Sequence, residues 1–388
     1  MKSFRDILAP LILAPVMLAG AAALCGCSSR DDFSEPRDNN TTTPDGNTYL
    51  LLNTGIIERA DAETAGAVPS RELINTLRVI LVGDGGNVEY NELADYANQP
   101  RAGVYRVFRT TPGHKTIYLL ANEAGAGVSL APALNPFDAK ALEAYSFSNE
   151  GSAEALPASA KYEFDIAEAD RGKRVEKRFN LVRAATKFQF RFKNYRSDTV
   201  RVNSVKVSAL ASAMYLMPRV GEPDLVKTFD GTPLHWAEWL RLVAEESQAD
   251  LRYSPADYTL TNLRGWIKAY DLPAAATHRS RAIDLAGLPV PKLMKKADLP
   301  VVSHAFYFNE SRSAATSDGT QTYRMTFHLT QGKQQVTLTR DFPNLEALFR
   351  NTHVLVDVEF SSEIIIKVIP YAECKLDPIF GLTRKETY

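Results

Sequence analysis

The sequence predicts a mostly β protein with two antiparallel β-sandwich domains, the second of which carries short helical insertions. Short runs rich in β-branched and aromatic residues recur about every ten residues and end at Gly, Pro, Asn or Asp turns. No stretch alternates strand and helix patterns in the way that a parallel α/β sheet requires. The chain has 388 residues, which suits two domains of roughly 100–200 residues each.

The composition is that of an ordinary globular protein and excludes several classes. Hydrophobic residues make up 45% and charged residues 23% of the chain, which rules out bulk disorder. The 45 Lys and Arg residues balance the 46 Asp and Glu residues, so no basic surface indicates nucleic acid as a partner. Three cysteines exclude a disulfide-stapled scaffold and a four-cysteine zinc site.

Residues 1–26 have the pattern of a secretory signal peptide. A short charged start precedes residues 7–24, which are almost entirely apolar or small. Pro10 and Pro15 interrupt this run, and a membrane-spanning helix needs about 20 apolar residues without such breaks. The segment therefore predicts export followed by removal of the leader.

The leader ends at Leu24-Cys25-Gly26-Cys27, which resembles a bacterial lipobox. Gly26 supplies the small residue that precedes the lipid-bearing cysteine, so we expect cleavage between Gly26 and Cys27 and lipid attachment at Cys27. Cys25 would need Leu24 in the place of the small residue. With Cys27 acylated, Cys374 has no cysteine left for an intramolecular disulfide. An ordinary signal peptide with an incidental cysteine is the alternative.

Residues 27–47 are predicted to be a polar tether, because their Asp, Asn, Thr, Pro and Gly content cannot bury enough surface to fold. Arg30-Asp31-Asp32 resembles the export signal of surface lipoproteins in Bacteroidetes. This resemblance favours the outer face of the outer membrane as the location, with the lipid as the attachment.

The first domain is expected over residues 48–194. Phe188, Phe190 and Phe192 alternate with Gln189 and Arg191, which predicts a half-buried strand. Ala and Leu residues at 139–145 predict a short helix. Strands are expected at 48–57, 73–82, 105–108, 116–120 and 175–192.

The second domain is expected over residues 195–388, with a helical insertion at about 221–299. Within the insertion, residues 233–248 have the spacing of an amphipathic helix, and 289–299 form a second short helix. Both domains are expected to be transthyretin- or immunoglobulin-like. Strands are expected at 200–207, 305–309, 323–329, 335–340, 354–360 and 364–369.

No motif for catalysis or for a cofactor is present, so we predict no enzyme, no cofactor and no metal. The six histidines lie far apart in the sequence, and none sits two to four residues from another. Trp236, Trp239 and Trp266 are candidates for a sugar-binding platform, although core packing is the favoured interpretation.

Several segments, in this order along the chain, resemble the fimbrillin family of Bacteroidales, the lipoprotein precursors of type V pili. They follow the lipobox and the polar tether, and they extend over most of residues 24–382. The segments are TYLLLNTGIIER before Ala60, LVRAATK at 181–187, YLMP at 215–218, FYFNE at 306–310, RNTH at 350–353, and the ending at 369–371 and 376–382.

The resemblance implies a fimbrial subunit that polymerises by donor-strand exchange. In that mechanism the first strand keeps the precursor monomeric until a trypsin-like protease cuts after an Arg, and a neighbour's strand then fills the empty place. Here the displaced strand carries the apolar residues Tyr49, Leu50, Leu51, Leu52, Ile56 and Ile57. The candidate donor residues at the other end of the chain are Ile364, Ile365, Ile366, Val368, Leu376, Phe380 and Leu382.

Arg59-Ala60 is the first choice of processing bond and Arg71 is the second, while no processing is a third alternative. The implied partners are neighbouring subunits, the outer membrane through the lipid, and host or bacterial surface targets of adhesion. The competing interpretation is a surface lipoprotein that does not polymerise and that anchors fimbriae or binds a glycan or a host protein.

Overall fold

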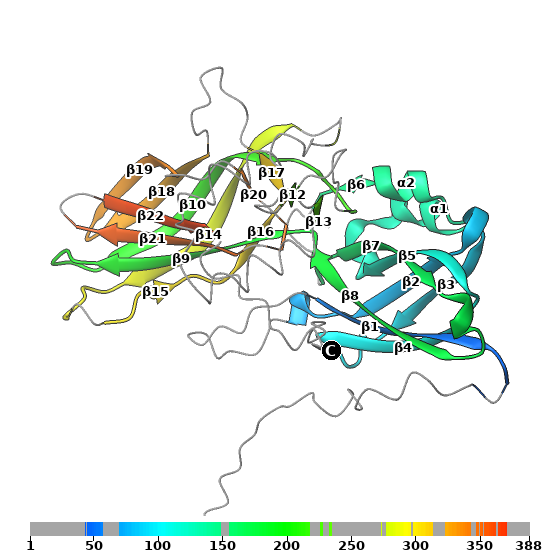
Figure 1. Cartoon of the computed structure of the whole chain (residues 1–388). Helices are drawn as coiled ribbons and strands as arrows, with labels where there is room; N and C mark the ends of the chain where they lie inside the picture. The colour runs from blue at the N-terminus through cyan, green and yellow to red at the C-terminus, as the bar shows by residue number, and fades with distance from the viewer. Residues whose placement is uncertain are drawn as a thin grey trace, which may run out of the picture. The chain divides into compact units, whose positions relative to one another are not determined.

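Strands dominate the chain and form two groups of sheets (Figure 1). The computed structural model describes residues 43, 45–56, 70–148, 155–217, 226–227, 233–234, 273, 277–295, 298–312, 323–342, 347–348, 350–351, 353–361 and 364–370. All of these residues belong to one compact unit, Asp38–Tyr388. The three tryptophans lie outside the described residues.

The first group is a seven-stranded sheet in the order β3-β2-β5-β7-β8-β1-β4. Its strands are β1 (Thr48–Ile56), β2 (Thr76–Val82), β3 (Val88–Asp95), β4 (Gly103–Thr110), β5 (Gly113–Ala121), β7 (Ala158–Ile166) and β8 (Arg174–Arg183). The short helices α1 (Ala131–Leu134) and α2 (Ala139–Ala144) pack on Ile80, Tyr118 and Leu120 of β2 and β5. The predicted helix at 139–145 is confirmed by α2, whose first turn is capped by the Asp138 carboxylate.

The two edges of this sheet approach each other, because the sheet curls around one hydrophobic cluster. Tyr90 of β3 stacks on Phe108 of β4 with ring centroids 4.5 Å apart, although β3 and β4 stand at opposite ends of the strand order. Leu50 of β1 and Leu119 of β5 belong to the same cluster. The first strand therefore lies over the core that the later strands build.

The second group consists of two sheets that share one hydrophobic cluster. One sheet has the order β14-β10-β18-β19, formed by β10 (Val200–Ala211), β14 (His278–Val290), β18 (Arg324–Gln331) and β19 (Gln334–Asp341). The other has the order β15-β9-β21-β22, with β16 (Phe306–Phe308) also paired to β9. Its strands are β9 (Thr186–Asn194), β15 (Val301–Val302), β21 (His353–Phe360) and β22 (Ile364–Pro370).

The alternating aromatic pattern is confirmed, because Phe188, Phe190 and Phe192 are fully buried in the second cluster. Their strand β9 pairs with strands of the second group only. The chain therefore passes from one group to the other at Ala184 and Ala185, ten residues before the predicted boundary at 194. The sequence pattern runs on unbroken across this point, since β8 and β9 are separated by only these two residues.

The expectation of purely antiparallel sheets is wrong at two places. β1 pairs with β8 in parallel, and β9 pairs with β21 in parallel. In each case more than a hundred residues separate the partners, and such a long connection brings a strand back in either direction. Side-chain alternation carries no information about that direction.

The predicted helical insertion at 221–299 is also wrong where the structure describes it. Three strands lie in that range: β12 (Val226–Lys227), β13 (Pro233–Leu234) and the long β14. β13 takes the first two residues of the helix predicted at 233–248, whose remainder lies outside the described residues. The second predicted helix, 289–299, begins inside β14, and its other described residues are not helical. Buried Ile283 and Leu285 alternate with exposed Ala282 and Asp284, which is the strand signal that the sequence analysis missed.

Four further short strands form two pairs: β6 (Ser146–Phe147) pairs with β11 (Met214–Tyr215), and β17 (Ser311–Arg312) pairs with β20 (Ala347–Leu348). In the described ranges no helix has the length and apolar character needed to cross a membrane.

Candidate functional site: the first strand and the junction network

The first strand lies inside its sheet with a partner on each side. β1 pairs with β4 along eight residues in antiparallel fashion, and with β8 along eight residues in parallel. Leu50 thus stands opposite Phe108 of β4 and Val175 of β8. Removal of β1 would leave two strand edges with unpaired N–H and C=O groups facing each other.

The side chains of β1 complete the hydrophobic core of the first group. Leu50 and Leu52 are fully buried in the cluster that β2, β4 and β5 share, and Leu51, on the other face, is only 4% exposed. At ~1.5–3 kcal/mol for each buried leucine, the three contribute roughly 5–9 kcal/mol before entropy costs. Residues 49–52, which were predicted to be apolar residues of the displaced strand, lie within β1, and Tyr49 is half-buried.

Polar contacts fix the start of β1 against the turn that precedes β8. The backbone N–H of Gly172 donates to Oγ1 of Thr48 at 2.9 Å, and the N–H of Tyr49 donates to the Lys173 carbonyl at 3.0 Å. Thr43 donates both its backbone N–H and its hydroxyl to the carbonyl of Gly172. The hydroxyl of Tyr49 donates to the Asp45 carboxylate, which lowers the pKa of Asp45 and raises the pKa of Tyr49. These contacts set the register of the strand.

The neighbouring strand β4 forms the edge of the sheet and exposes apolar side chains. Tyr105 and Val107 are 40% and 50% exposed, and they stand opposite Asn53 and Leu51 of β1. Among the described strands, β4 pairs only with β1. Its backbone pairing with the rest of the sheet therefore passes through β1.

The other predicted site residues fall into two sets. Ile56 ends β1, opposite Leu181 of β8, while Ile364, Ile365, Ile366 and Val368 belong to β22, which pairs antiparallel with β21. The remaining residues lie outside the described part of the chain: Gly26, Cys27, Ile57, Arg59, Ala60, Leu376, Phe380 and Leu382.

Arg71, the second-choice processing residue, lies in a short 3-10 helix, Ser70–Glu72. Its guanidinium sits 4.7 Å from the centre of the Tyr307 ring. Its carbonyl oxygen accepts a hydrogen bond from the N–H of Leu156 at 2.7 Å. Both the side chain and the backbone of this residue are therefore engaged.

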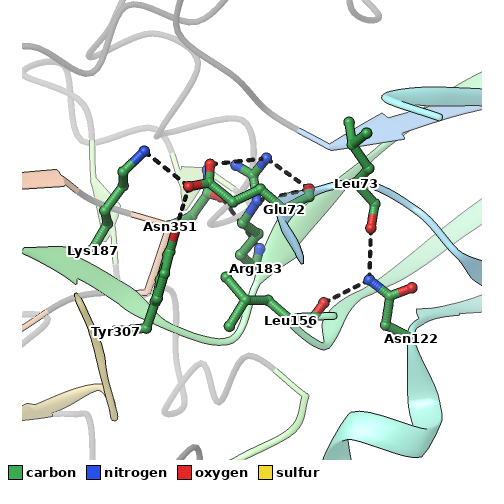
Figure 2. A network of polar contacts seen from close by, with 8 residues as sticks. All are labelled: Glu72, Leu73, Asn122, Leu156, Arg183, Lys187, Tyr307 and Asn351. Carbon is green, nitrogen blue, oxygen red and sulfur yellow. Dashed lines mark hydrogen bonds and ion pairs between the residues drawn. The ribbon is translucent and has the colours of Figure 1, made fainter. Parts of the chain in front are cut away.

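Glu72 is the centre of a buried polar cluster where the chain crosses from the first sheet group to the second (Figure 2). Its carboxylate lies 2.9 Å from Nζ of Lys187 and accepts the hydroxyl hydrogen of Tyr307. Its carbonyl accepts from Nη2 of Arg183 at 2.9 Å. Asn351 joins by donating its N–H to the carbonyl of Ala185 and accepting from the N–H of Arg183. We call Glu72, Arg183, Lys187, Tyr307 and Asn351 the junction network.

Burial and the neighbouring charges act in opposite directions on the pKa of Glu72. Burial raises the pKa of Glu72, but the positive charges of Arg183 and Lys187 outweigh it, so the net pKa is lowered. For Tyr307, burial and the Glu72 carboxylate both raise the pKa of the phenol. Glu72 is thus a buried carboxylate held in its charged form by two cations.

A second buried ion pair lies close in sequence to the network. Nε of Arg350 is 2.6 Å from the Glu310 carboxylate, and both side chains are essentially inaccessible. The other two nitrogens of Arg350 donate to the carbonyls of Tyr215 and Leu216. Every donor group of this guanidinium thus has an oxygen partner, which is what a fully buried arginine requires.

These contacts bring together four of the segments that carried the family resemblance. Segment 181–187 supplies Arg183 and Lys187, segment 306–310 supplies Tyr307 and Glu310, and segment 350–353 supplies Arg350 and Asn351. Segment 215–218 supplies the two carbonyls that Arg350 binds. Sequence reasoning quoted these segments without assigning their polar residues a role. It missed Glu72 altogether, because a single acid beside the strand pattern that begins at residue 73 gives no sign of burial.

No family model matches the chain, and no curated protein matches it. Solved structures do match it over nearly their whole length. The alignment with a candidate cell-adhesion protein from Parabacteroides distasonis covers 84% of this chain and 97% of that protein, with 11% identity and a TM-score of 0.49. The tip fimbrial protein Mfa3 from Porphyromonas gingivalis, truncated at its C-terminus, covers 84% and 99%, with 10% identity and a TM-score of 0.48.

The structural neighbours of this chain are fimbrial and candidate cell-adhesion proteins of Bacteroidales. A fimbrial assembly protein from Parabacteroides distasonis is a further example, with 11% identity, a TM-score of 0.43, and coverage of 84% of this chain and 98% of its own. Within the described residues, no group of three or more His, Cys, Asp or Glu side chains is placed to hold a metal ion.

Proposed function

We propose that this protein is a structural subunit of a cell-surface fimbria that serves adhesion and assembles by exchange of its first strand. It is exported as a lipoprotein attached through Cys27 to the outer membrane and is processed after Arg59. The partner in the assembled state is a neighbouring copy or a related subunit. The observation that carries the proposal is the place of β1 between β4 and β8.

β1 is joined to β2 by one connection, residues 57–75, which contains Arg59. A cut after Arg59 separates β1 from β2, so that only the sheet holds β1. Loss of β1 exposes two strand edges and the apolar surface that Leu50, Leu51 and Leu52 cover. A strand from another molecule replaces both the backbone hydrogen bonds and the buried side chains, which favours assembly over an empty slot.

We infer that residues 376–382 are the donor segment, because their sequence can be aligned with that of β1. When Gly381 takes the place of Gly55, Leu376 takes the place of Leu50 and Leu382 that of Ile56. Pro378 and Phe380 then fall on the same face, opposite the polar positions Lys375 and Asp377. We infer this register for the donor strand, with one backbone hydrogen bond lost at Pro378.

A second candidate function is a subunit that accepts or anchors other subunits without donating a strand. The observation that favours it is the pairing of β22 with β21, because residues 364–370 are thereby engaged within their own chain. In this case residues 371–388 alone remain for donation, or the chain keeps its first strand and its lipid. Such a protein anchors fimbriae or binds a glycan or a host protein at the cell surface.

We also infer that the two sheet groups are two β-sandwich domains joined at Ala184 and Ala185. The support is that each group has a hydrophobic cluster built from its own residues, and that among the described strands only β6 and β11 pair across the groups. Separate expression of residues 186–388 tests this. A folded fragment with cooperative unfolding is expected, and an unfolded fragment would contradict the division.

The test of the function is the N-terminus of the protein taken from the cell surface, combined with gel analysis of unheated samples. A start at Ala60 together with a heat-sensitive ladder is expected. Arg59→Ala is expected to retain Cys27 as the first residue and to lose the ladder, while the matched control Arg37→Ala leaves both unchanged. A wild-type protein that starts at Cys27 without a ladder would contradict polymerisation and favour the anchor.

A further inference from the structure

The peptide bond between Arg71 and Glu72 follows a basic residue, yet contacts restrain it on both sides. A trypsin-like protease must bind the chain in extended form, take the Arg side chain into its specificity pocket, and place the carbonyl oxygen in its oxyanion hole. Each of these three requirements meets an obstacle in the folded chain.

On the N-terminal side of the bond, the groups that the protease needs are already occupied. The carbonyl oxygen of Arg71 accepts the hydrogen bond of Leu156 at 2.7 Å. The guanidinium of Arg71 lies over the Tyr307 ring. The helical turn Ser70–Glu72 is incompatible with the extended conformation that a protease binds.

On the C-terminal side, Glu72 and the two residues after it are tied to the core. Glu72 is 6% exposed and is held by Lys187, Tyr307 and Arg183. The carbonyl of Leu73 accepts from Nδ2 of Asn122 at 2.8 Å, as Figure 2 shows. The N–H of Ile74 donates to the carbonyl of Arg101 at 2.7 Å. Cleavage at Arg71 therefore requires local unfolding of residues 70–74.

We propose that the junction network selects the processing site by protecting the Arg71–Glu72 bond in the folded chain. Any trypsin-like cut between β1 and β2 then falls N-terminal to Ser70, and residues 60–71 remain on the mature protein when the cut follows Arg59. Glu72 and Tyr307 act as positioning residues, since they hold the bond and do not take part in its hydrolysis. The biological use of this protection rests on the proposed function, but the protection itself does not.

The wild-type chain supplies a test that needs no variant. The full-length protein is treated briefly with trypsin at neutral pH, and the new N-termini are identified by mass spectrometry. Lys295 serves as the internal reference, because it is exposed in the loop between β14 and β15 and its backbone bonds to Asp298 lie within that same loop. Cleavage after Arg71 is expected to be at least about tenfold slower than cleavage after Lys295, because it waits for local opening. Equal initial rates at the two residues would overturn the proposal.

Two variants test whether the network is the cause. Glu72→Ala removes the carboxylate, and Tyr307→Leu removes both the hydroxyl and the ring beneath Arg71. Each variant is expected to raise the rate of trypsin cleavage after Arg71 by about tenfold, relative to the rate of cleavage after Lys295. The matched control Glu92→Gln, on the exposed face of β3, is expected to leave the ratio unchanged. If the ratio of the two cleavage rates is unchanged in both network variants, the proposal that the junction network protects the Arg71–Glu72 bond is contradicted.

A variant that unfolds globally can be recognised, because its rates of cleavage after Arg71 and after Lys295 both rise. In that case the ratio of the two cleavage rates in the wild-type protein decides whether the Arg71–Glu72 bond is protected. The outcome is also separable from that of the proposed function. Surface protein that starts at Cys27, with Arg71 still protected, contradicts processing and leaves this proposal intact. Surface protein that starts at Glu72 supports processing and overturns this proposal.

Discussion

The first strands of the two sheet groups, β1 and β9, have similar places in their sheets but different connections to the chain. β1 lies between antiparallel β4 and parallel β8, and β9 lies between antiparallel β15 and β16 and parallel β21. β9 follows β8 after only two residues and leads directly to β10, whereas residues 57–75 separate β1 from β2. After a single cut in that connection β1 is joined to the later strands only through the sheet, whereas no single cut has this effect on β9.

Burial does not distinguish the two strands. Leu50 and Leu52 of β1 are as inaccessible as Phe188, Phe190 and Phe192 of β9. What makes a strand exchangeable is therefore its connectivity, because a strand that is tied at both ends cannot leave even when its contacts are no stronger. The comparison predicts that a core mutation in β9 weakens every form of the protein, and that a core mutation in β1 weakens only the form that still carries it.

The largest effect is expected for Phe190→Ala in β9. The change empties a fully buried site among other aromatic rings, and such cavities cost about 3–5 kcal/mol. Denaturant unfolding of the uncleaved and of the trypsin-processed protein should show the same loss in both. Lys193→Ala on the opposite face of β9 is the control, with a change below about 0.5 kcal/mol. A loss confined to the uncleaved form would contradict the distinction between the strands.

A somewhat smaller effect is expected for Leu52→Ala in β1. In the uncleaved protein the free energy of unfolding should fall by about 2–5 kcal/mol, because the side chain is fully buried. After cleavage and replacement of the strand, the loss should disappear, since the altered residue has left the sheet. Asn53→Ala on the same strand is the control. Equal destabilisation of the assembled, processed protein would show that β1 is not replaced.

Glu72, which lies where the chain crosses between the two sheet groups, should make the free energy of unfolding depend on pH. Its folded pKa lies below the ordinary value of 4.5, so its charge contributes stability above the unfolded pKa. That contribution is lost as the pH falls through the folded pKa, when the carboxylate becomes protonated. In Glu72→Gln this part of the acid destabilisation should be absent, and at neutral pH unfolding should be easier by about 1–3 kcal/mol. Unfolding curves at a series of pH values measure both, and parallel acid profiles for wild type and variant would contradict the role of Glu72.

The smallest effect is expected for Thr48→Ala at the start of β1. The change leaves the buried N–H of Gly172 without its acceptor, which costs about 1–2 kcal/mol. Because the contact is at one end of β1, hydrogen exchange should accelerate in β1 and not in β9. Thr337→Ala, an exposed position on β19, is the control. Uniform acceleration across both strands would mean that β1 does not open separately.

The pattern of side chains along the sequence predicted most strands, because alternation between buried and exposed positions is a local property. The triplet Phe188, Phe190 and Phe192 and the leucine run of β1 belong to this class. β14 was missed because the alternation at Ile283 and Leu285 is short and the end of the strand was assigned to the helix predicted at 289–299. The crossing between the sheet groups at Ala184 and Ala185 could not be read from the sequence, because the strand pattern has no gap there.

The candidate site divides in the same way. The residues of the first strand could be selected from their apolar run, and the structure describes most of them as β1. The junction network could not be found, because its members come from positions 72 to 351 and each looks like an ordinary strand or turn residue. The partners of a buried charge are set by which strands are neighbours, and neighbours are not encoded in any local pattern.

The sequence by itself determined where many of the strands lie and which of their faces are apolar, since these follow from propensity and from the two-residue period of a strand. Only the tertiary structure decided the direction of pairing, the place of β1 between two partners, and the enclosure of the Arg71–Glu72 bond. These depend on contacts between residues far apart in the chain, and hydrophobic burial selects such contacts through the whole fold and not through any one segment.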